Sequence, residues 1–493
     1  MNRALLCFQW NSPKSPNQNK SHWGDSNPRP SDYESDALPA KPQWHKPAEF
    51  IFEHKQLGKN TSIHELEAFP RTMSEDASVR YTNTILIDHN GVRQEGDVLL
   101  HADGSWSVSN GDEDVQEVID GSKKLITRSL QNWHTHLAMQ LNGRDFSDGF
   151  PLHRWLNEAI FPTESRISPK YVRVGSSSAA AEMIKTGSTF AADMYFFPST
   201  TGEVLEQAGL RGLIGGPVSD IALPSHPDAK SALDELDGLL ATNDKTRRIQ
   251  YAIATHSVYL CSEETLLQAS ELAEKRKARL HIHVSETRKE ISDCFSAHKK
   301  YPVEYLDSID FFKPGTICAH ASWVKKNEIQ LLKNHEATVV HCPSSNMKLA
   351  CGGTLSYPAY AQAGVDVRLG TDGAASSGNG LNLLAEAKTA SLVQRHDHWD
   401  ATLLPASEIF QIATKGSQDW VAWGTDDIRM SPHGRGRNRY LSHLVYNGAE
   451  CLDMWVEGRQ LRKDGVTLSL DEQSIRQDID LAVEHYYEGV EGN

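Results

Sequence analysis

Two patterns of apolar and polar positions follow each other along this chain. Between residues 81 and 129, short apolar runs are separated by turn-forming residues, which predicts a small β-rich unit. Its clearest turn is Asn90-Gly91, because Asn-Gly between apolar runs favours a β-hairpin. From about residue 131, strand-like apolar runs alternate with helical stretches such as 264–278. The expected strands of this second region are 188–195, 211–218, 249–257, 279–286, 316–321, 337–343 and 365–373.

The second pattern predicts a barrel. Alternation of strands and helices implies parallel βαβ units, and the strand that ends at His136 brings the number of strands to eight. From His134 to Asp372 is 238 residues, close to the roughly 250 of a TIM-like barrel. We therefore predict an α/β fold with a (β/α)8 barrel, and a doubly wound parallel sheet is the structural alternative.

Strand-like sequence returns near the C-terminus, at 441–448 and 451–461, and a polar helix is expected over 471–489. We expect the late strands to join the early ones in a small β-sandwich domain. The predicted organisation is a first β-sandwich part at 73–130, the barrel at 131–425, and a second β-sandwich part with the C-terminal helix at 426–493.

The first 72 residues differ from the rest in composition. They hold 8 of the 21 prolines, and residues 12–47 are rich in Ser, Asn and Pro without a helix or strand period. Such a segment buries too little apolar surface to offset its ordering entropy, so residues 1–72 are predicted to be disordered. An alternative hypothesis is that Met73 is the true start and that this leader is upstream sequence read in error. Intact-mass measurement of the native protein distinguishes the two.

Composition and charge narrow the function classes. The chain has 39% hydrophobic residues, and its 50 Lys and Arg against 65 Asp and Glu give a net charge of −15. An acidic chain does not attract nucleic acid or anionic membranes by long-range electrostatics, so neither is expected as a partner. The sequence contains no run of 18 apolar residues, so no membrane-spanning helix is expected. Seven scattered cysteines without a C-x-x-C motif favour a reducing, cytoplasmic location.

The strongest chemical signal is a set of polar residues at the ends of the predicted barrel strands, where barrel enzymes place catalytic groups. Residues i and i+2 of a strand share one side, so the two histidines of a His-x-His pair can reach one ion. Taken singly, such a pair is more often a surface pair or a pair of packed histidines, whereas the joint order of residues is far more specific. His281 shares the face of His283 and is assigned to packing in the barrel interior. The set comprises His134, His136, His283, Glu286, His320 and Asp372.

Several long strings carry a family resemblance. They are NWHTHLAMQLNGRDFSDGFPLHRWLNEAIFPTE (132–164), ATHSVYLCS (254–262), HIHVSET, AHASW, HCPSSNMKL and GTDGAAS. In this order they resemble the amidohydrolase superfamily, and within it the 5′-methylthioadenosine/S-adenosylhomocysteine deaminases. The resemblance runs from about residue 81 to the C-terminus.

The resemblance implies a metal site. In that family one divalent ion, usually zinc or iron, is held by the residues that match His134, His136, His283 and Asp372. Imidazole and carboxylate ligands suit such an ion, with water in the open position. Two-metal relatives use a carboxylated Lys after the fourth strand, and the matching stretch 253–257 has none. One metal ion, zinc or iron, is therefore expected.

The resemblance also implies roles for the other residues. The ion would activate a water for attack on the amine-bearing carbon. His320 would orient that water, Glu286 would move its proton to the ring nitrogen, and Asp372 would help the second proton reach departing ammonia. Glu164 matches a residue that binds ribose hydroxyls, although a helix-surface acid is about equally probable on sequence grounds. His256 matches a residue that contacts substrate.

The predicted function is hydrolytic deamination of an adenosine-type nucleoside such as methylthioadenosine or adenosylhomocysteine. Guanine deaminase-like or triazine hydrolase-like activity on C–N bonds is the alternative, followed by a catalytically inactive scaffold. The H-x-E and P-C-x-x-C motifs of cytidine-type deaminases are absent. The family's arginines after the third strand have no match in 219–236, which leaves the exact substrate open. A small-molecule substrate and a homo-oligomer are expected.

Overall fold

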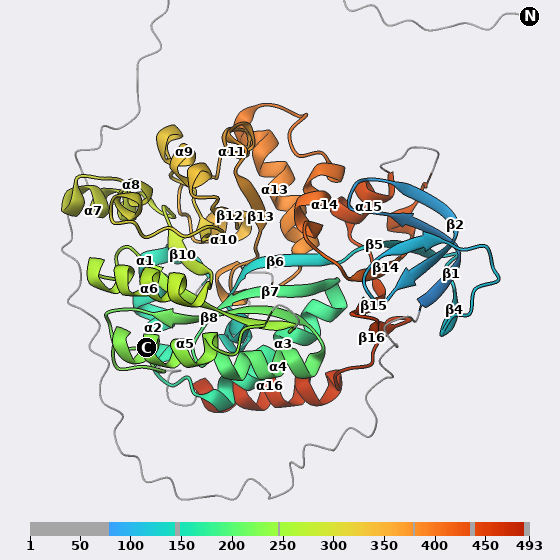
Figure 1. The fold of residues 1–493 in the computed structure, drawn as a ribbon, viewed down its shortest axis with the longest axis horizontal. Coiled ribbons are helices and arrows are strands. Elements are labelled where there is room, and N and C mark those ends of the chain that lie inside the picture. The colour runs from blue at the N-terminus through green and yellow to red at the C-terminus, as the bar shows by residue number, and fades with distance from the viewer. Residues whose placement is uncertain (1–77, 143–147, 245–246, 378–379, 434–438, 488–493) are drawn as a thin grey trace, which may run out of the picture. The chain divides into compact units, whose positions relative to one another are not determined.

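A computed structural model describes residues 78–142, 148–244, 247–377, 380–433 and 439–487. The predicted leader 1–72 and the hypothetical start at Met73 lie outside these residues. Figure 1 shows the strands of the barrel surrounded by helices, with strands from both ends of the chain in a separate sheet.

Eight parallel strands form the barrel, and they follow one another in space in the order of the sequence. This order excludes the doubly wound alternative, which needs a reversal of strand order in the middle of the sheet. The barrel closes between the first strand and the loop that follows the last strand. Here the backbone N–H of Asp372 donates to the backbone oxygen of His134 at 2.9 Å. The strands are β6 (Leu130–Thr135), β7 (Ser188–Met194), β8 (Arg211–Val218), β9 (Ile249–Ser257), β10 (Leu280–Val284), β11 (Ile317–His320), β12 (Thr338–His341) and β13 (Asp366–Leu369).

Helices connect successive barrel strands and bury one face against them. In α5 (Ala229–Leu240), for example, the spacing of Ala232, Leu233 and Leu236 places them on one buried face. The carboxylate of Asp228 caps this helix by accepting from the backbone N–H of Ser231 at 2.8 Å. The others are α3 (Pro169–Thr186), α4 (Pro198–Ala208), α6 (Glu263–Arg276), α7 (Arg288–His298), α8 (Pro302–Ser308), α9 (Lys326–Asn334), α10 (Pro343–Lys348) and α11 (Tyr357–Ala363). The helices α12 (Ala374–Ser377), α13 (Leu383–His398) and α14 (Ala406–Thr414) follow the last barrel strand.

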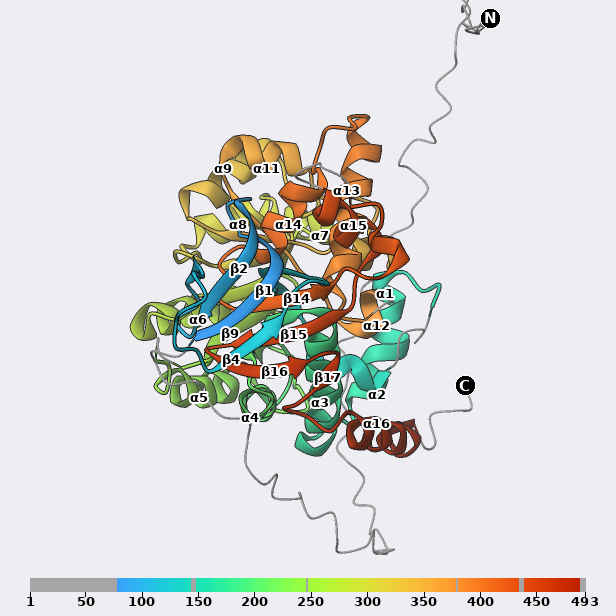
Figure 2. The ribbon, with the colours of Figure 1, turned by 90° about the vertical axis from the view of Figure 1, so that its right-hand side faces the viewer.

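Strands from the two ends of the chain combine in one mixed sheet, as the pattern predicts (Figure 2). The N-terminal strand β5 pairs antiparallel with β14, which in turn pairs with β15. One of these strands, β14, falls inside the range 131–425 that is predicted for the barrel. The members are β1 (Ser78–Ile87), β2 (Arg93–His101), β3 (Trp106–Val108), β4 (Glu117–Asp120), β5 (Lys124–Arg128), β14 (Trp420–Gly424), β15 (Cys451–Val456), β16 (Arg459–Lys463) and β17 (Val466–Thr467).

The prediction of a strand at 441–448 is wrong. This segment belongs to the helix α15 (Arg439–Asn447). Its buried residues Tyr440, Leu441, Leu444 and Val445 recur with helical spacing, so a helix buries all four on one side. The short turn η3 (Ile428–Met430) precedes it. The predicted strand at 451–461 is instead a hairpin of β15 and β16.

Short helical turns cross the mouth of the barrel between β6 and α3. They are η1 (Leu137–Asn142), α1 (Leu152–Arg154), the π-helical turn η2 (Trp155–Ile160) and α2 (Phe161–Glu164). The C-terminal helix α16 (Glu472–Tyr487) packs against α3 and η1, and its Ala482 belongs to the same apolar cluster as Trp155 and Ile160. The chain's last helix thus supports the segment that covers the barrel mouth.

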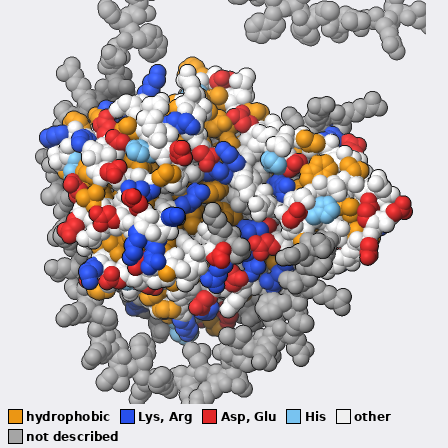
Figure 3. Space-filling model, viewed as in Figure 1, with side chains coloured by type: hydrophobic (Ala, Val, Ile, Leu, Met, Phe, Trp, Pro, Cys, Tyr) orange, Lys and Arg blue, Asp and Glu red, His pale blue; other side chains and the backbone are white. Residues whose placement is uncertain are grey.

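The surface carries charges of both signs. Acidic and basic side chains are interspersed over the face seen in Figure 3, without a large field of one sign. In the described ranges, every helix is too short or too polar to cross a bilayer. The cysteines of the described part of the chain, at 261, 294, 318, 342, 351 and 451, are all buried free thiols.

Candidate active site

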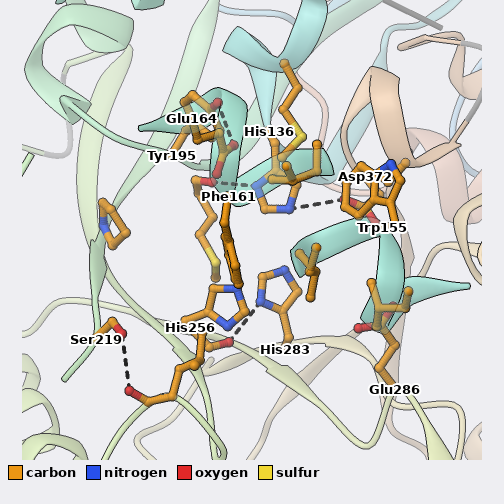
Figure 4. A pocket seen from close by; sticks show the side chains of 18 of the residues that line it. His136, Trp155, Phe161, Glu164, Tyr195, Ser219, His256, His283, Glu286 and Asp372 are labelled. Atoms are coloured by element: carbon orange, nitrogen blue, oxygen red, sulfur yellow. Dashed lines mark hydrogen bonds and ion pairs between the residues drawn. The ribbon is translucent and has the colours of Figure 1, made fainter. Parts of the chain in front are cut away.

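A pocket opens at the carboxyl ends of the barrel strands, where the sequence places the chemistry (Figure 4). His134 lies beside it and is fully buried at the end of β6. The other predicted site residues all line the pocket: His136, Glu164, His256, His283, Glu286, His320 and Asp372. Residues from positions 134 to 372 are therefore brought to one site.

Two overlapping groups of ligand atoms meet at the bottom of the pocket. His134, His136 and Asp372 form one group and His134, His283 and His320 the other, with the atoms in each group within 4.8 Å of one another. Asp372 Oδ1 lies 3.1 Å from His136 Nε2 and 3.7 Å from His134 Nε2. The buried Nε2 of His134 has no hydrogen-bond partner. Imidazole nitrogens and a carboxylate converging on an unpartnered buried nitrogen fit a divalent metal ion.

The far nitrogen of each ring is held by the protein. His136 Nδ1 lies 2.5 Å from the backbone oxygen of Met194, and His283 Nδ1 lies 2.9 Å from that of His256. A carbonyl accepts only from a protonated nitrogen, so both rings carry a proton on Nδ1 and direct Nε2 toward the cluster. The third ring, His134, has its Nδ1 at 2.9 Å from Nε2 of His281. His281 is buried in the barrel as predicted, but it also orients a candidate ligand.

Burial and neighbouring charges shift the pKa values of this cluster in different directions. Burial lowers the pKa values of His134 and His283 well below the ordinary value, which keeps both imidazoles neutral and suited to metal binding. Burial also opposes the charged forms of His136 and Asp372, but their contact outweighs it. The pKa of His136 rises to about 9, and that of Asp372 falls well below its usual range.

Asp372 is held by its own loop and by α10. Ser345 Oγ donates to Oδ2 at 2.6 Å, and the backbone N–H of Gly373 donates to Oδ1, also at 2.6 Å. The closing bond from Asp372 N–H to the oxygen of His134 ties this loop to β6. Gly370 allows that approach, because a Cβ there would lie 2.8 Å from both Cβ and the backbone nitrogen of His134.

Glu286 stands opposite His320 in a loop that is itself tightly held. Its Oε2 lies 3.8 Å from His320 Nε2, and Cys351 Sγ donates to its Oε1 at 3.4 Å. The buried carboxylate of Glu290 accepts from the backbone N–H groups of Ser285 and Glu286, at 2.7 and 2.8 Å. These two bonds stabilise Ser285 in a left-handed conformation with φ of +53°, which turns Glu286 into the pocket. Burial raises the pKa of Glu286, as suits a group that exchanges protons.

The proton of His320 is placed by Asn346. The Oδ1 of Asn346 accepts from Ser322 Oγ at 3.3 Å, so its amide nitrogen faces His320 Nδ1 at 3.2 Å. An amide N–H donates to an unprotonated ring nitrogen, which leaves the His320 proton on Nε2. That N–H points toward the same space as Glu286.

Glu164 and His256 lie on the pocket walls, and the ring centroid of His256 is 4.8 Å from that of His283. Glu164 ends α2 and is buried, not a helix-surface acid, and Tyr195 OH donates to its Oε1 at 2.7 Å. Burial raises the pKa of Glu164 to about 7. Burial lowers that of His256 to about 3, so this imidazole is neutral. Figure 4 shows Glu164 beside Tyr195, with Glu286 across the pocket.

Sequence reasoning missed the residues that position the site. Ser345 and Asn346 lie within HCPSSNMKL, and Tyr195 ends a predicted strand, but no spacing distinguishes them from ordinary polar residues. Glu290 lies four residues after Glu286 at the start of a helix, where acidic residues are common anyway. The partners of Ser345, Asn346 and Tyr195 lie 27, 26 and 31 residues away in the sequence, so only the fold reveals these contacts.

Residues 125–419 match the model of the amidohydrolase family. The chain belongs to the amidohydrolase family. A 5′-deoxyadenosine deaminase of Methanothermobacter thermautotrophicus is 38% identical over 426 residues, which cover 81% of this chain and 97% of the relative. A 5-methylthioadenosine/S-adenosylhomocysteine deaminase of Archaeoglobus fulgidus is 35% identical over 372 residues, 72% of this chain and 86% of the relative.

The fold of this amidohydrolase also occurs in solved structures. An adenosine deaminase from Xanthomonas campestris with bound zinc superposes with a TM-score of 0.78 at 23% identity, and the alignment covers 84% of this chain and 99% of that one. The predicted barrel and family are therefore confirmed. Amidohydrolases are metal-dependent, which agrees with the donor set at the barrel mouth.

Proposed function

We propose that this amidohydrolase deaminates an adenosine-type nucleoside by hydrolysis. The observation that carries the proposal is a cluster of metal-binding side chains with a buried carboxyl, Glu286, on one side and a second buried carboxyl, Glu164, on the pocket wall. The first arrangement suits attack by water on a purine carbon, and the second suits recognition of sugar hydroxyls. The relatives at 35–38% identity are nucleoside deaminases by name.

His134, His136, His283 and Asp372 would hold one divalent ion, zinc or iron. The orphaned Nε2 of His134 and the fixed orientation of the other two rings support this assignment. A single ion is supported by the end of β9, where Ile253–Ser257 contains no lysine. Bound there, the ion would polarise a water molecule and make it nucleophilic near neutral pH.

The protein's own groups would then move the protons. Glu286 would accept a proton from the attacking water and deliver it to the ring nitrogen beside the attacked carbon. The Nε2–H of His320 would donate a hydrogen bond to the incoming oxygen and direct it. A second proton, passed with the help of Asp372, would leave with the amine as ammonia, so that one water is consumed for each ammonia released.

The remaining pocket residues would hold the nucleoside. Glu164 would accept hydrogen bonds from the ribose hydroxyls, because Tyr195 engages one of its oxygens and leaves the other available. The neutral His256 would contact the substrate from the β9 side of the pocket.

Ammonia release from a substrate panel tests the function. The panel contains 5′-deoxyadenosine, methylthioadenosine, adenosylhomocysteine, adenosine, guanine and cytosine. We expect turnover of adenosine-type nucleosides and none of guanine or cytosine. Turnover of guanine alone would favour the guanine deaminase-like alternative. A purified protein that binds no divalent ion even after reconstitution would favour an inactive scaffold.

We further propose that the enzyme acts in the cytoplasm as a homo-oligomer. The free thiols of the described cysteines support a reducing compartment. The side chains of Trp399 and Ile428 are 94% and 85% exposed, which supports burial against another copy. Light scattering after size-exclusion chromatography measures the oligomeric state directly.

A further inference from the structure

The part of the pocket away from the metal-binding cluster has apolar walls. One wall comes from the turns that cross the barrel mouth, and the opposite wall comes from the loop after β8. The residues that define them are Leu152, Trp155, Leu156 and Phe161 on the first wall, and Ile221 and Leu223 on the second. Trp155 is held in place because it also belongs to the apolar cluster beneath the mouth.

The described pocket lining carries the carboxyl groups of Glu164, Glu286 and Asp372 and no Lys or Arg. His136, whose pKa is raised, lies at the cluster beside Asp372. The cations next to lining residues in the sequence are engaged elsewhere. Arg154 donates to Glu158 at 2.9 and 2.8 Å, and Lys348 Nζ donates to the oxygen of Ala375 at 2.9 Å.

The proposed function fixes which part of a nucleoside meets these walls. The amine-bearing carbon must lie at the cluster, and the 2′ and 3′ hydroxyls at Glu164. The 5′ carbon is attached to C4′, across the sugar ring from the glycosidic carbon, so its substituent extends away from the cluster. It therefore lies between the mouth turns and the loop after β8.

We infer that this pocket selects nucleosides whose 5′ substituent is small and apolar, such as hydrogen or methylthio, over one that carries an amino-acid group. The inference rests on the proposed function. A carboxylate between these walls loses water without gaining a cation from the described lining. A methyl or methylthio group gains apolar contact instead. A hydroxyl, as in adenosine, is intermediate because an apolar pocket rejects it only modestly.

The test compares kcat/KM for 5′-deoxyadenosine, methylthioadenosine, adenosine and adenosylhomocysteine with the metal-loaded full chain. We expect either of the first two to exceed adenosylhomocysteine by ~10²-fold or more. Equal values, or a preference for adenosylhomocysteine, would overturn the inference while leaving the proposed function intact. If none of the four nucleosides is turned over, the proposed function fails, and the inference with it.

A charge introduced into the wall provides a second, independent measurement. Leu223 is partly exposed in the loop after β8, so a long polar side chain fits there. Leu223→Arg should raise the ratio of kcat/KM for adenosylhomocysteine to that for methylthioadenosine by at least ~10-fold. Leu223→Gln, which is polar but uncharged, should leave this ratio within about 3-fold of the original. Equal ratios in the two variants would show that charge does not govern the selection.

Discussion

Glu286 combines burial, a raised pKa and a fixed direction, three properties that a proton-transferring carboxyl needs. Its direction comes from Glu290, whose carboxylate accepts the two backbone N–H groups of the turn. Its Oε2 lies 3.8 Å from Nε2 of His320, and it lies beside the cluster of candidate ligands and not within it. Removal of its acidity should therefore affect chemistry without affecting metal binding.

The variant Glu286→Gln tests this role. Glutamine fills the same space but does not exchange protons, so kcat should fall by ~10²-fold or more with the metal content unchanged. Steady-state kinetics and elemental analysis of the same preparation measure the two quantities. Near-normal turnover in the metal-loaded variant would discredit the assigned role.

His281 should act on metal binding and not on proton transfer. It contacts His134 Nδ1 and is fully buried, and partners of this kind orient a ligand ring. His281→Leu should weaken metal affinity by about 10–100-fold, since the ring of His134 loses its support. Competition with a chelator measures the affinity, and Glu286→Gln is the comparison variant that should keep it. Unchanged affinity in a folded His281→Leu protein would contradict the assignment.

At the scale of elements, the site depends on how β6 meets the loop after β13. The backbone bond from Asp372 to His134 joins two candidate ligands across the closure of the barrel. The side chains of Asn132 and Thr371 reinforce the same junction, since each residue both donates to and accepts from the other. The contacts that close the barrel therefore also bring these two candidate ligands together.

Gly370→Ala should disturb both the closure of the barrel and the candidate metal site. The added methyl would lie 2.8 Å from the backbone nitrogen of His134, so β6 and the loop must separate, at a cost of about 1–3 kcal/mol. We expect a lower melting temperature and weaker metal binding. Gly238→Ala is the control, because no atom lies within 4 Å of its added methyl in α5, and it should match or exceed the original stability. Equal melting temperatures for the two variants would count against this account of the junction.

At the scale of the whole molecule, the two chain ends are joined by a buried ion pair. Lys124 in β5 donates to Asp453 in β15 at 2.7 Å and to Asp464 at 2.6 Å. Tyr81 OH donates to the same carboxylate of Asp453, which is fully buried. The ammonium group of Lys124 thus links strands that lie more than 300 residues apart in the sequence.

Lys124→Met should destabilise the protein by about 3–5 kcal/mol, since it leaves the carboxylate of Asp453 buried without its counter-ion. Its neighbour Lys123 pairs with Asp426 at the surface, where both side chains are mostly exposed, so Lys123→Met should change stability little. Denaturant titration of the two variants gives the comparison. A similar loss in both would show that the buried pair contributes no more than the exposed one.

Much of the fold follows from local patterns. The barrel strands were predictable because each is a short apolar run bounded by turns or helical sequence, and all eight predicted barrel strands are present within a few residues. The helix α15 was not predictable in this way. Its buried apolar residues are the adjacent pairs 440–441 and 444–445, and so short a run fits a buried strand as well as a helix. Packing against α13 and α14 decides in favour of the helix.

The sequence by itself determined the family and the barrel, and it singled out residues that meet at one pocket. A parallel strand places its last residues at a known edge, so His134, His283, His320 and Asp372 were already assigned to one end of the barrel. Tertiary structure alone decided what holds those residues and what faces them. The hydrogen bonds of Ser345 to Asp372 and of Tyr195 to Glu164 join segments whose sequence patterns are unrelated. The apolar walls of the pocket likewise come from separate segments. Such contacts depend on distances between elements that the closed barrel sets, and no local pattern encodes those distances.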